Sequence, residues 1–282
     1  MEIVSDPGDM QAVSLAWRDL GQKITLVPTM GYFHDGHLSL MRYGRERGDR
    51  LVVSLFVNPT QFGPSEDLSR YPRDLERDEA LAREVGVDVL YTPAAVNMYP
   101  EGYQTYVTVE DLSRPLCGAS RPGHFRGVAT VVLKLFHQVL PHLAIFGDKD
   151  YQQLAVIKRL VADLNVPVEV VGRPIVREAD GLAMSSRNTY LNPEERRRAL
   201  CLIQALTRAR DLAASGETKA GPILSEVHQM ISSTPGTRLD YAVLVDPHTL
   251  KDMDTIRGSA RLAVAAWVGG TRLIDNLLLE VN

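Results

Sequence analysis

The chain has 282 residues, 45% of them hydrophobic, and a formal net charge of −4. This length and composition predict a soluble globular protein with a substantial buried core, folded as one large domain or two smaller ones. Acidic and basic residues are mixed along the chain rather than gathered in long basic blocks, so we expect no nucleic-acid partner.

The N-terminal segment and the cysteine content indicate the compartment. Glu2 and Asp6 precede any apolar run, so this segment lacks the basic and hydrophobic parts of a signal peptide. The longest apolar stretches are far shorter than the ~20 residues of a membrane-spanning helix. Cys117 and Cys201 provide neither a disulfide framework nor a metal-ligand cluster and fit a reducing environment. We therefore expect a cytoplasmic protein that does not bind a membrane.

Residues 1–173 alternate between short apolar runs and amphipathic segments. The apolar runs predict strands at residues 23–28, 50–57, 87–92, 143–147 and 166–171. Apolar residues at three- and four-residue steps predict helices at residues 37–48, 73–86, 127–140 and 150–164. This alternation predicts a Rossmann-like α/β domain, with a doubly wound parallel sheet and ligands bound where the strands end.

Residues 174–282 have a different pattern and predict a smaller α+β domain. We expect a long helix from Pro193 to about Ala214 and a second from about Gly221 to Ile231. Strands are expected at residues 239–245, 261–268 and 271–279, with a tight turn at Gly269 and Gly270 between the last two.

The octet "MGYFHDGH", residues 30–37, follows the first predicted strand and begins a helix. Backbone N–H groups and the helix dipole favour a bound phosphate there. His34 and His37 lie three residues apart and can donate hydrogen bonds to a triphosphate, while Gly36 permits close approach. The alternative is a capped helix with solvent-facing histidines. A zinc site is less favoured, because no third or fourth ligand is evident nearby.

Four further motifs are candidates for ligand binding. Ser185, Ser186 and Arg187 suit a mobile phosphate clamp hinged at Gly181, although such a stretch is also typical of a surface loop. The other motifs are Gly147 with Lys149 and Asp150, Asn58 with Gln61, and Arg121 with His124 and Arg126. Their alternatives are a helix N-cap, a turn and a surface salt bridge, respectively.

Together these motifs resemble the pantothenate synthetase (pantoate–β-alanine ligase) family of the nucleotidyltransferase superfamily. The resemblance rests on "PTMGYFHDGH", "SLFVNPTQF", "YPRD", "RPGHFRGV", "FGDKDYQQL" and "VREADGLAMSSRN", which occur in this order over most of the chain. It implies that ATP and pantoate form pantoyl adenylate and pyrophosphate, and that β-alanine then yields pantothenate and AMP. It also implies Mg²⁺ on the phosphates and a homodimer.

The resemblance also implies roles for individual residues. The catalytic set comprises His34, His37, Lys149, Ser185, Ser186 and Arg187. The ATP-binding set comprises Met30, Gly31, Tyr32, Phe33, His34, Asp35, Gly36, His37, Gly147, Asp148, Lys149, Asp150, Val176, Met184, Ser185, Ser186 and Arg187. The residues for pantoate and β-alanine are Gln61, Gln153, Asn58 and Arg121, and Asp78 is expected in the outer coordination sphere of Mg²⁺.

Three rival functions remain open from the sequence. A nucleotidyltransferase acting on a phosphorylated substrate would share the histidine motif but would not need Gln61 and Gln153. A fragment of an aminoacyl-tRNA synthetase is disfavoured because a basic or anticodon-reading domain is absent. A catalytically silent nucleotide sensor would bind ATP and produce no AMP.

Overall fold

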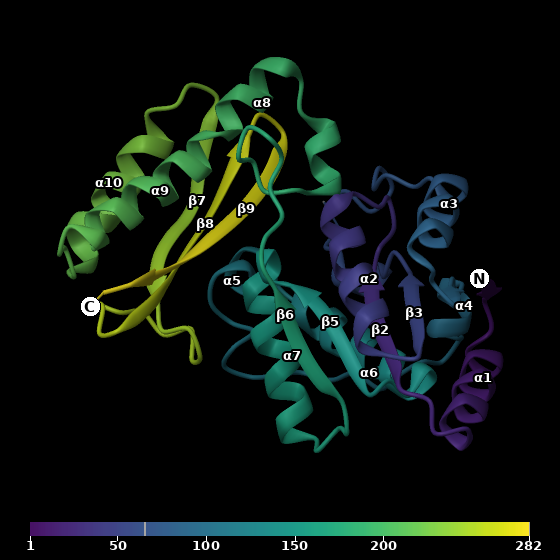
Figure 1. Ribbon diagram of the computed structural model, residues 1–282. Helices are drawn as coiled ribbons and strands as arrows, with labels where there is room; N and C mark the ends of the chain where they lie inside the picture. The colour runs from purple at the N-terminus through teal and green to yellow at the C-terminus, as the bar shows by residue number, and fades with distance from the viewer. Residues whose placement is uncertain (65, 282) are drawn as a thin grey trace. The chain divides into compact units, whose positions relative to one another are not determined.

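The structure is a computed structural model that describes residues 1–64 and 66–281 (Figure 1). Its internal contacts divide the chain into two compact units. The first comprises Met1–Asp148 and Gln152–Pro174, and the second comprises Lys149–Tyr151 and the chain from Ile175 onward. The short segment Lys149–Tyr151 therefore clusters with the second unit, although its sequence position lies within the first.

The first unit contains a parallel sheet in the order β1-β4-β3-β2-β5-β6 (Figure 1). Its strands are β1 (Glu2–Val4), β2 (Ile24–Thr29), β3 (Arg50–Leu55), β4 (Val89–Tyr91), β5 (Leu143–Gly147) and β6 (Glu169–Arg173). The order reverses between β2 and β5, as in doubly wound folds. The predicted Rossmann-like sheet is confirmed, while β1 was not predicted.

The helices that surround this sheet are mostly those that the periodicity predicted. They are α1 (Pro7–Asp19), α2 (Asp35–Arg47), α3 (Leu75–Val85), α4 (Ala95–Met98), α5 (Cys117–Ser120), α6 (His124–Val139) and α7 (Tyr151–Asp163), with 3₁₀ turns η1 (Pro59–Gln61) and η2 (Asp148–Asp150). Helices α2 and α3 contact each other, as do α1 and α6. Helices α1, α4 and α5 were not predicted.

Both faces of the central strands are buried. Ile24, Leu26 and Val27 of β2 are completely buried, as are Leu51 and Val53 of β3. Neighbouring residues of a strand point to opposite faces, so burial of consecutive residues requires cover on both sides. This explains why the strands read as continuous apolar runs rather than as alternating patterns.

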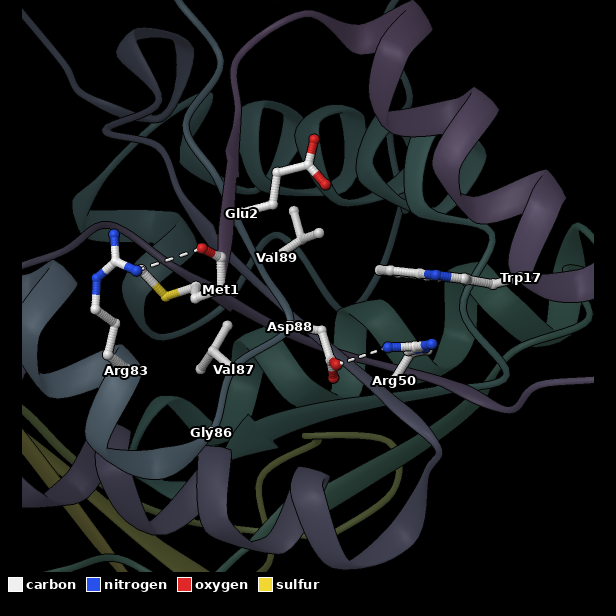
Figure 2. A pocket seen from close by; sticks show the side chains of 9 residues that line it. All are labelled: Met1, Glu2, Trp17, Arg50, Arg83, Gly86, Val87, Asp88 and Val89. Atoms are coloured by element: carbon white, nitrogen blue, oxygen red, sulfur yellow. Dashed lines mark hydrogen bonds and ion pairs between the residues drawn. The ribbon is translucent and has the colours of Figure 1, made fainter.

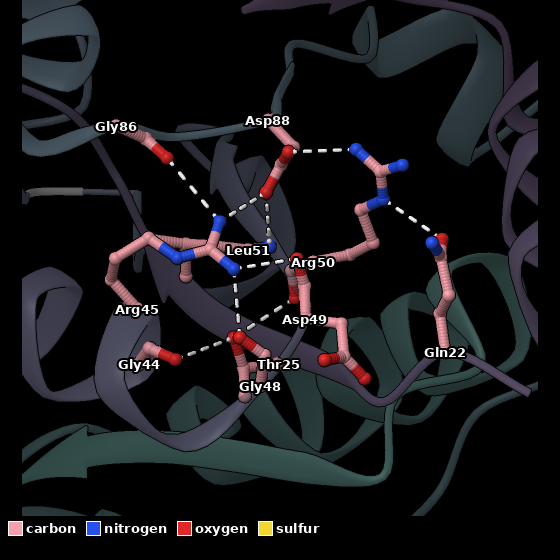
Figure 3. Close-up of polar contacts among 10 residues, drawn as sticks. All are labelled: Gln22, Thr25, Gly44, Arg45, Gly48, Asp49, Arg50, Leu51, Gly86 and Asp88. Carbon is pink, nitrogen blue, oxygen red and sulfur yellow. Dashed lines mark hydrogen bonds and ion pairs between the residues drawn. The ribbon is translucent and has the colours of Figure 1, made fainter.

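The Asp88 side chain links several segments at the edge of the sheet where β3 begins (Figure 3). Its Oδ2 accepts a hydrogen bond from the backbone N–H of Leu51 at 2.8 Å and pairs with Arg45 of α2. Its Oδ1 pairs with Arg50 Nη1 at 3.1 Å, and Arg50 Nε donates to Gln22 Oε1. One carboxylate therefore links a helix, a strand and the connection before β4.

A pocket of about 680 Å³ lies at this same edge and includes Trp17, Arg50 and Arg83 in its lining (Figure 2). Ligands of doubly wound folds bind instead where the strands end, at the opposite edge. We therefore assign this pocket no part in the predicted chemistry.

The second unit contains an antiparallel sheet in the order β7-β8-β9. Its elements are η3 (Ser186–Tyr190), α8 (Pro193–Ala199), α9 (Cys201–Ala214), α10 (Ala220–Ser232), β7 (Thr237–Val245), β8 (Ser259–Val268) and β9 (Thr271–Glu280). Val268 pairs with Thr271 around the predicted two-residue turn, where Gly269 has a φ of +55°. A Cβ at Gly269 would lie 1.9 Å from Glu195 Oε1, so a side chain there would displace that carboxylate.

The prediction of one long helix from Pro193 to Ala214 was wrong. Two helices, α8 and α9, meet at Leu200, which is the C-cap of the first and the N-cap of the second. The N–H of Leu200 bonds to the carbonyls of Arg197 and Arg198 rather than to Arg196, which tightens the chain locally. Neither glycine nor proline marks this interruption.

Candidate active site

The histidine octet lies at the point where the strand order of the parallel sheet reverses. Strand β2 leads into residues 30–37, and its neighbour β5 leads into Asp148. The register pairs β2 with β3 from Ile24 to Thr29, whereas it pairs β2 with β5 at Thr25 and Leu26. The two strands therefore part before they end, as expected of a ligand-binding switch point.

Asp78 at the start of α3 fixes the conformation of this octet. Its Oδ2 accepts from the N–H of Tyr32 and its Oδ1 from the N–H of Phe33, both at 2.6 Å. Gly31 and Tyr32 have φ angles of +85° and +55°. A Cβ at Gly31 would lie 3.0 Å from Asp78 and from Leu55, so glycine suits this position. The buried carboxylate thus holds a tight, strained turn.

Burial raises the pKa of Asp78, and the two backbone hydrogen bonds oppose this rise without cancelling it. Both oxygens already accept hydrogen bonds from the loop. The role of Asp78 in the outer sphere of Mg²⁺ stays a prediction, whereas its role in shaping the histidine turn follows from these contacts.

His34 and His37 lie together at the start of α2. His34 is the N-cap residue, and its N–H donates to His37 Nδ1 at 3.3 Å. The two ring centroids are 4.0 Å apart, and the ring of Phe33 lies 5.7 Å from that of His37. Because Nδ1 of His37 accepts, the proton of the neutral ring lies on Nε2. His37 therefore has an N–H donor on the side away from its own turn.

The other residues of the octet differ in how they can meet a ligand. Phe33 is completely buried in the core against α2, so its side chain is committed to packing. Asp35 is exposed, and Tyr32 is half-buried beneath the guanidinium of Arg77, 5.3 Å from the ring centroid. Met30 Sδ accepts from Gln61 Nε2 at 3.1 Å, which links the octet to the next motif.

Asn58 and Gln61 follow β3, the neighbour of β2, and both are buried. Asn58 Nδ2 donates to Gln61 Oε1 at 3.1 Å and to the carbonyl of Gly127 at 3.2 Å. Asn58 Oδ1 accepts from the hydroxyls of Thr60 and Tyr99 at 2.9 and 2.8 Å. These bonds fix the orientation of both amides, so Gln61 keeps Nε2 as its donor.

Arg121 reaches the backbone of Gln61 from the loop before α6. It forms a bidentate pair with Glu66 at 2.9 and 2.6 Å, and its Nη2 donates to the Gln61 carbonyl at 3.3 Å. His124 Nδ1 also lies 2.8 Å from that carbonyl. Burial alone would raise the pKa of Glu66, but the hydrogen bond and charge of Arg121 outweigh it and lower that pKa. In these contacts Arg121 supports Gln61, and its contact with substrate stays a prediction.

The two glutamines that begin α7 have different surroundings. Gln152 is buried and bonds to the backbone of Cys117, Leu112 and Pro115, which holds the loop before α5. Gln153, the predicted pantoate residue, is half-buried. The contacts of Gln152 thus hold a loop, and the role of Gln153 in pantoate binding stays a prediction.

The second unit carries Val176, Met184 and Ser185–Arg187, whereas Gly147 and Asp148 belong to the first unit. Val176 and Met184 are brought together by a hydrogen bond from the N–H of Met184 to the carbonyl of Val176, 3.0 Å long. This bond belongs to a short hairpin with Gly181 in its turn at a φ of +93°. Ser185 follows directly and caps η3 by accepting from the N–H of Arg187 at 3.3 Å, and Ser186 is buried.

Charged contacts hold the hairpin of residues 176–184. Arg196 of α8 pairs with Glu178 and with Asp180, each at 2.7 Å, and Glu178 Oε1 accepts from Asn188 Nδ2. The hydrogen bond from Arg196 lowers the pKa of both carboxyl groups. The segment that leads to Ser185–Arg187 is thus anchored at Glu178 and Asp180, just before Gly181. Whether it closes on ATP stays a prediction.

The described residues lack two further features. In residues 1–64 and 66–281, no three or more His, Cys, Asp or Glu side chains gather in a way that could hold a metal ion. Over the same residues, no helix combines the length and apolar character needed to cross a membrane.

Comparison with known proteins identifies the family. The model of the pantoate-beta-alanine ligase family matches residues 2–278. The pantothenate synthetase of Syntrophus aciditrophicus is 58% identical over 276 residues, covering 98% of this chain and 96% of that protein. The enzyme of the same name from Geobacter sulfurreducens is 57% identical over 279 residues, covering 99% of each.

Solved structures agree. The pantothenate synthetase of Thermus thermophilus has a TM-score of 0.93 and 48% identity, covering 98% of this chain and 99% of that one. A pantoate-beta-alanine ligase from Francisella tularensis has a TM-score of 0.82 and 32% identity, covering 99% and 97%. The fold and the residues thus define a Rossmann-like ligase. The chain belongs to the pantoate-beta-alanine ligase family, which confirms the predicted resemblance.

Proposed function

We propose that this ligase activates pantoate with ATP and transfers the pantoyl group to β-alanine. The observation that carries this reaction is the match of the family model to residues 2–278. The Francisella tularensis ligase, described as complexed with beta-gamma ATP and β-alanine, supports these substrates. The placement of the histidine octet at the sheet's switch point supports an ATP site there.

The reaction proceeds in two balanced steps. An oxygen of the pantoate carboxylate attacks the α-phosphorus of ATP, and the bond to the β-phosphate breaks, giving pantoyl adenylate and pyrophosphate. The amine of β-alanine then attacks the pantoyl carbonyl, the bond to AMP breaks, and the amine loses a proton. Catalysis depends on positioning and on stabilising the charge of the leaving groups, since no covalent enzyme intermediate is needed.

We assign His37 Nε2–H as a donor to the phosphates, because its Nδ1 already accepts from His34. Charge grows on pyrophosphate in the transition state, and a preorganised donor stabilises it more than it stabilises bound ATP. We further propose that Lys149, Ser185, Ser186 and Arg187 bind phosphate oxygens. Their cationic and hydroxyl groups fit that role, and the family resemblance supports it.

Gln61 and Gln153 are proposed to bind pantoate. The donor Nε2 of Gln61 is set by its bond from Asn58, so Asn58 acts on substrate through Gln61. An oriented, uncharged amide suits the hydroxyls and carboxylate of a small hydroxy acid.

We propose Mg²⁺ as the partner of ATP. Mg²⁺ keeps several water ligands and is usually held by substrate phosphates with one or two carboxylates, so it needs no dedicated cluster of protein side chains. Asp78 would reach it through water, because both of its oxygens also serve the loop backbone. When bound, the ion would neutralise charge on the phosphates.

We also propose that the enzyme is a cytoplasmic homodimer. The homodimer follows from the family resemblance, and light scattering of the purified chain should give twice the mass of one chain. The cytoplasm follows from the N-terminal segment and the cysteine content, and fractionation of cells that express the full chain would test it.

The experiment that tests the reaction uses ATP, Mg²⁺, pantoate and β-alanine, with each omitted in turn. Pantothenate and AMP should form with the complete mixture. Without β-alanine, a burst of pyrophosphate should match the enzyme concentration, and it should vanish without pantoate. AMP release that needs neither organic substrate would contradict the proposal.

A further inference from the structure

Two adjacent residues of β9, Asp275 and Asn276, are polar although each residue is only 3% exposed. Successive side chains of a strand point to opposite faces of the sheet, so the two serve different neighbours. Buried polar groups are costly unless they are hydrogen-bonded. Both have partners, which include Lys149, a predicted phosphate ligand, and Arg177, in the hairpin that precedes Ser185–Arg187.

Asn276 holds the segment Lys149–Tyr151, which clusters with the second unit. Its Nδ2 donates to the backbone carbonyl of Lys149 at 3.0 Å, and its Oδ1 accepts from Arg261 Nη1 at 3.0 Å. A guanidinium can only donate, so Arg261 fixes which end of the amide faces Lys149. The amide therefore cannot flip without losing both bonds.

Tyr151 secures the other end of the same segment. Its hydroxyl donates to the carbonyl of Pro247 at 2.7 Å. The guanidinium carbon of Arg261 lies 4.0 Å from the centroid of its ring, within the range of a cation–π contact. Arg261 thus touches both Asn276 and Tyr151, and the segment is held through the backbone of Lys149 and the side chain of Tyr151.

Asp275 holds the hairpin of residues 176–184 from the other face of the sheet. Its two oxygens accept from Arg177 at 2.7 and 3.0 Å. Arg177 Nη1 also donates to the carbonyl of Gly181 at 3.1 Å, across the turn of the hairpin. The chain emerging from this hairpin is Met184 followed by Ser185–Arg187, so its position depends on the anchor at Arg177.

We infer that Asp275 and Asn276 are positioning residues for ATP binding, which tie the Lys149 and Ser185–Arg187 segments to one strand. Neither residue needs to touch ATP. Each acts through backbone or an arginine, so the phosphate ligands are already held in place before ATP binds. Less conformational freedom is then lost on binding. This inference rests on the proposed function of the two segments.

The test compares Asn276→Asp and Asp275→Asn with the unaltered enzyme. Asn276→Asp keeps an oxygen acceptor for Arg261 but replaces the N–H donor to the Lys149 carbonyl with an oxygen. Asp275→Asn keeps the shape of the side chain and removes the negative charge that faces Arg177. Asp240→Asn is the matched control. Asp240 pairs at 2.7 Å with Arg272, which lies on the same strand as Asp275 and Asn276.

Loss of one such hydrogen bond should weaken the affinity for a non-hydrolysable ATP analogue roughly tenfold, measured by calorimetry. The KM of ATP should rise with it, while the KM of β-alanine stays at its original value. Asp240→Asn should leave both constants unchanged. Thermal unfolding by circular dichroism checks that each variant is folded at the assay temperature.

Two results would overturn the inference. One is unchanged affinity for the ATP analogue in both folded variants. The other is a lower melting temperature together with parallel changes of kcat and of every KM. That pattern marks a general loss of structure. If the unaltered enzyme forms no pantothenate, the proposed function fails, whereas normal activity combined with either result removes this inference alone.

Discussion

Asp78→Ala removes the acceptor of two backbone hydrogen bonds, each 2.6 Å long, that hold the turn before His34. The Asp78 side chain is 1% exposed, so water cannot easily replace it. Leaving a buried donor unsatisfied costs about 1–3 kcal/mol, so two such donors would cost about 2–6 kcal/mol. The burial that raises the pKa of Asp78 also makes its carboxylate costly, which offsets part of this loss. We expect the free energy of unfolding to fall by about 2–3 kcal/mol.

The same substitution should also impair catalysis. A displacement of about 1 Å in a catalytic group can cost roughly 10²-fold in rate, and the turn carries both histidines. We expect the single-turnover rate of pyrophosphate release to fall by that order, measured by rapid quench. Asp74→Ala is the control, because Asp74 caps the same helix through Arg77 N–H, and loss of a cap costs about 1 kcal/mol. Its rate should be unchanged.

The pH dependence provides an independent check on Asp78. Since its pKa is raised by burial, folding favours the protonated form. The resulting stabilisation is fully present below the ordinary pKa of aspartate and is lost as pH rises through the raised pKa. Compared with Asp78→Asn, the unaltered protein should therefore lose stability over this interval in urea unfolding. A normal pyrophosphate burst in a destabilised Asp78→Ala variant would refute the positioning argument.

Further predictions concern catalysis, acid stability and the far edge of the sheet. His37→Ala should slow pyrophosphate release by on the order of 10²-fold while the protein stays folded, and an unchanged burst rate would make this histidine structural. Arg196 lowers the pKa of Glu178, so the stabilisation is present above the unfolded-state pKa and is lost as pH falls through the lowered value. In urea unfolding, the stability of Glu178→Gln should fall less steeply with acid than that of the unaltered protein. Identical curves of stability against pH would contradict this expectation. Asp88→Ala leaves Arg45 and Arg50 without their shared partner. The free energy of unfolding should fall by about 2 kcal/mol at this half-buried site, with kcat unchanged. A fall in kcat without lost stability would count against its structural role.

Much of the fold could be predicted because long apolar runs and helical periodicity are local signals. Strand β1 has only three residues and is too short to give such a signal. Helix α1, which follows it, has a recognisable N-terminal signal. Asp6 accepts from the N–H groups of Gly8 and Asp9, and proline follows it directly, which is the pattern of a helix start. The break at Leu200 differs, because its sequence surroundings continue the helical pattern on both sides.

The candidate site was predictable where its residues stand at the ends of strands. Parallel strands end at one edge of a sheet, so the motifs after β2, β3 and β5 gather there without any knowledge of side-chain contacts. The partners that orient those motifs come from distant segments. Tyr99 is 41 residues from Asn58, and Asn276 is 127 residues from Lys149. No local pattern relates such pairs, so sequence reasoning missed Tyr99, Glu66, Asp275 and Asn276.

The shared carboxylate of Asp88 constrains the order in which this chain can change its sequence. If Arg45 or Arg50 is replaced first, Asp88 keeps one cation and its bond to the N–H of Leu51. If Asp88 is replaced first, two neighbouring cations repel each other with no anion between them. Descendants that have lost this cluster should therefore have passed through ancestors that lost an arginine while retaining the aspartate.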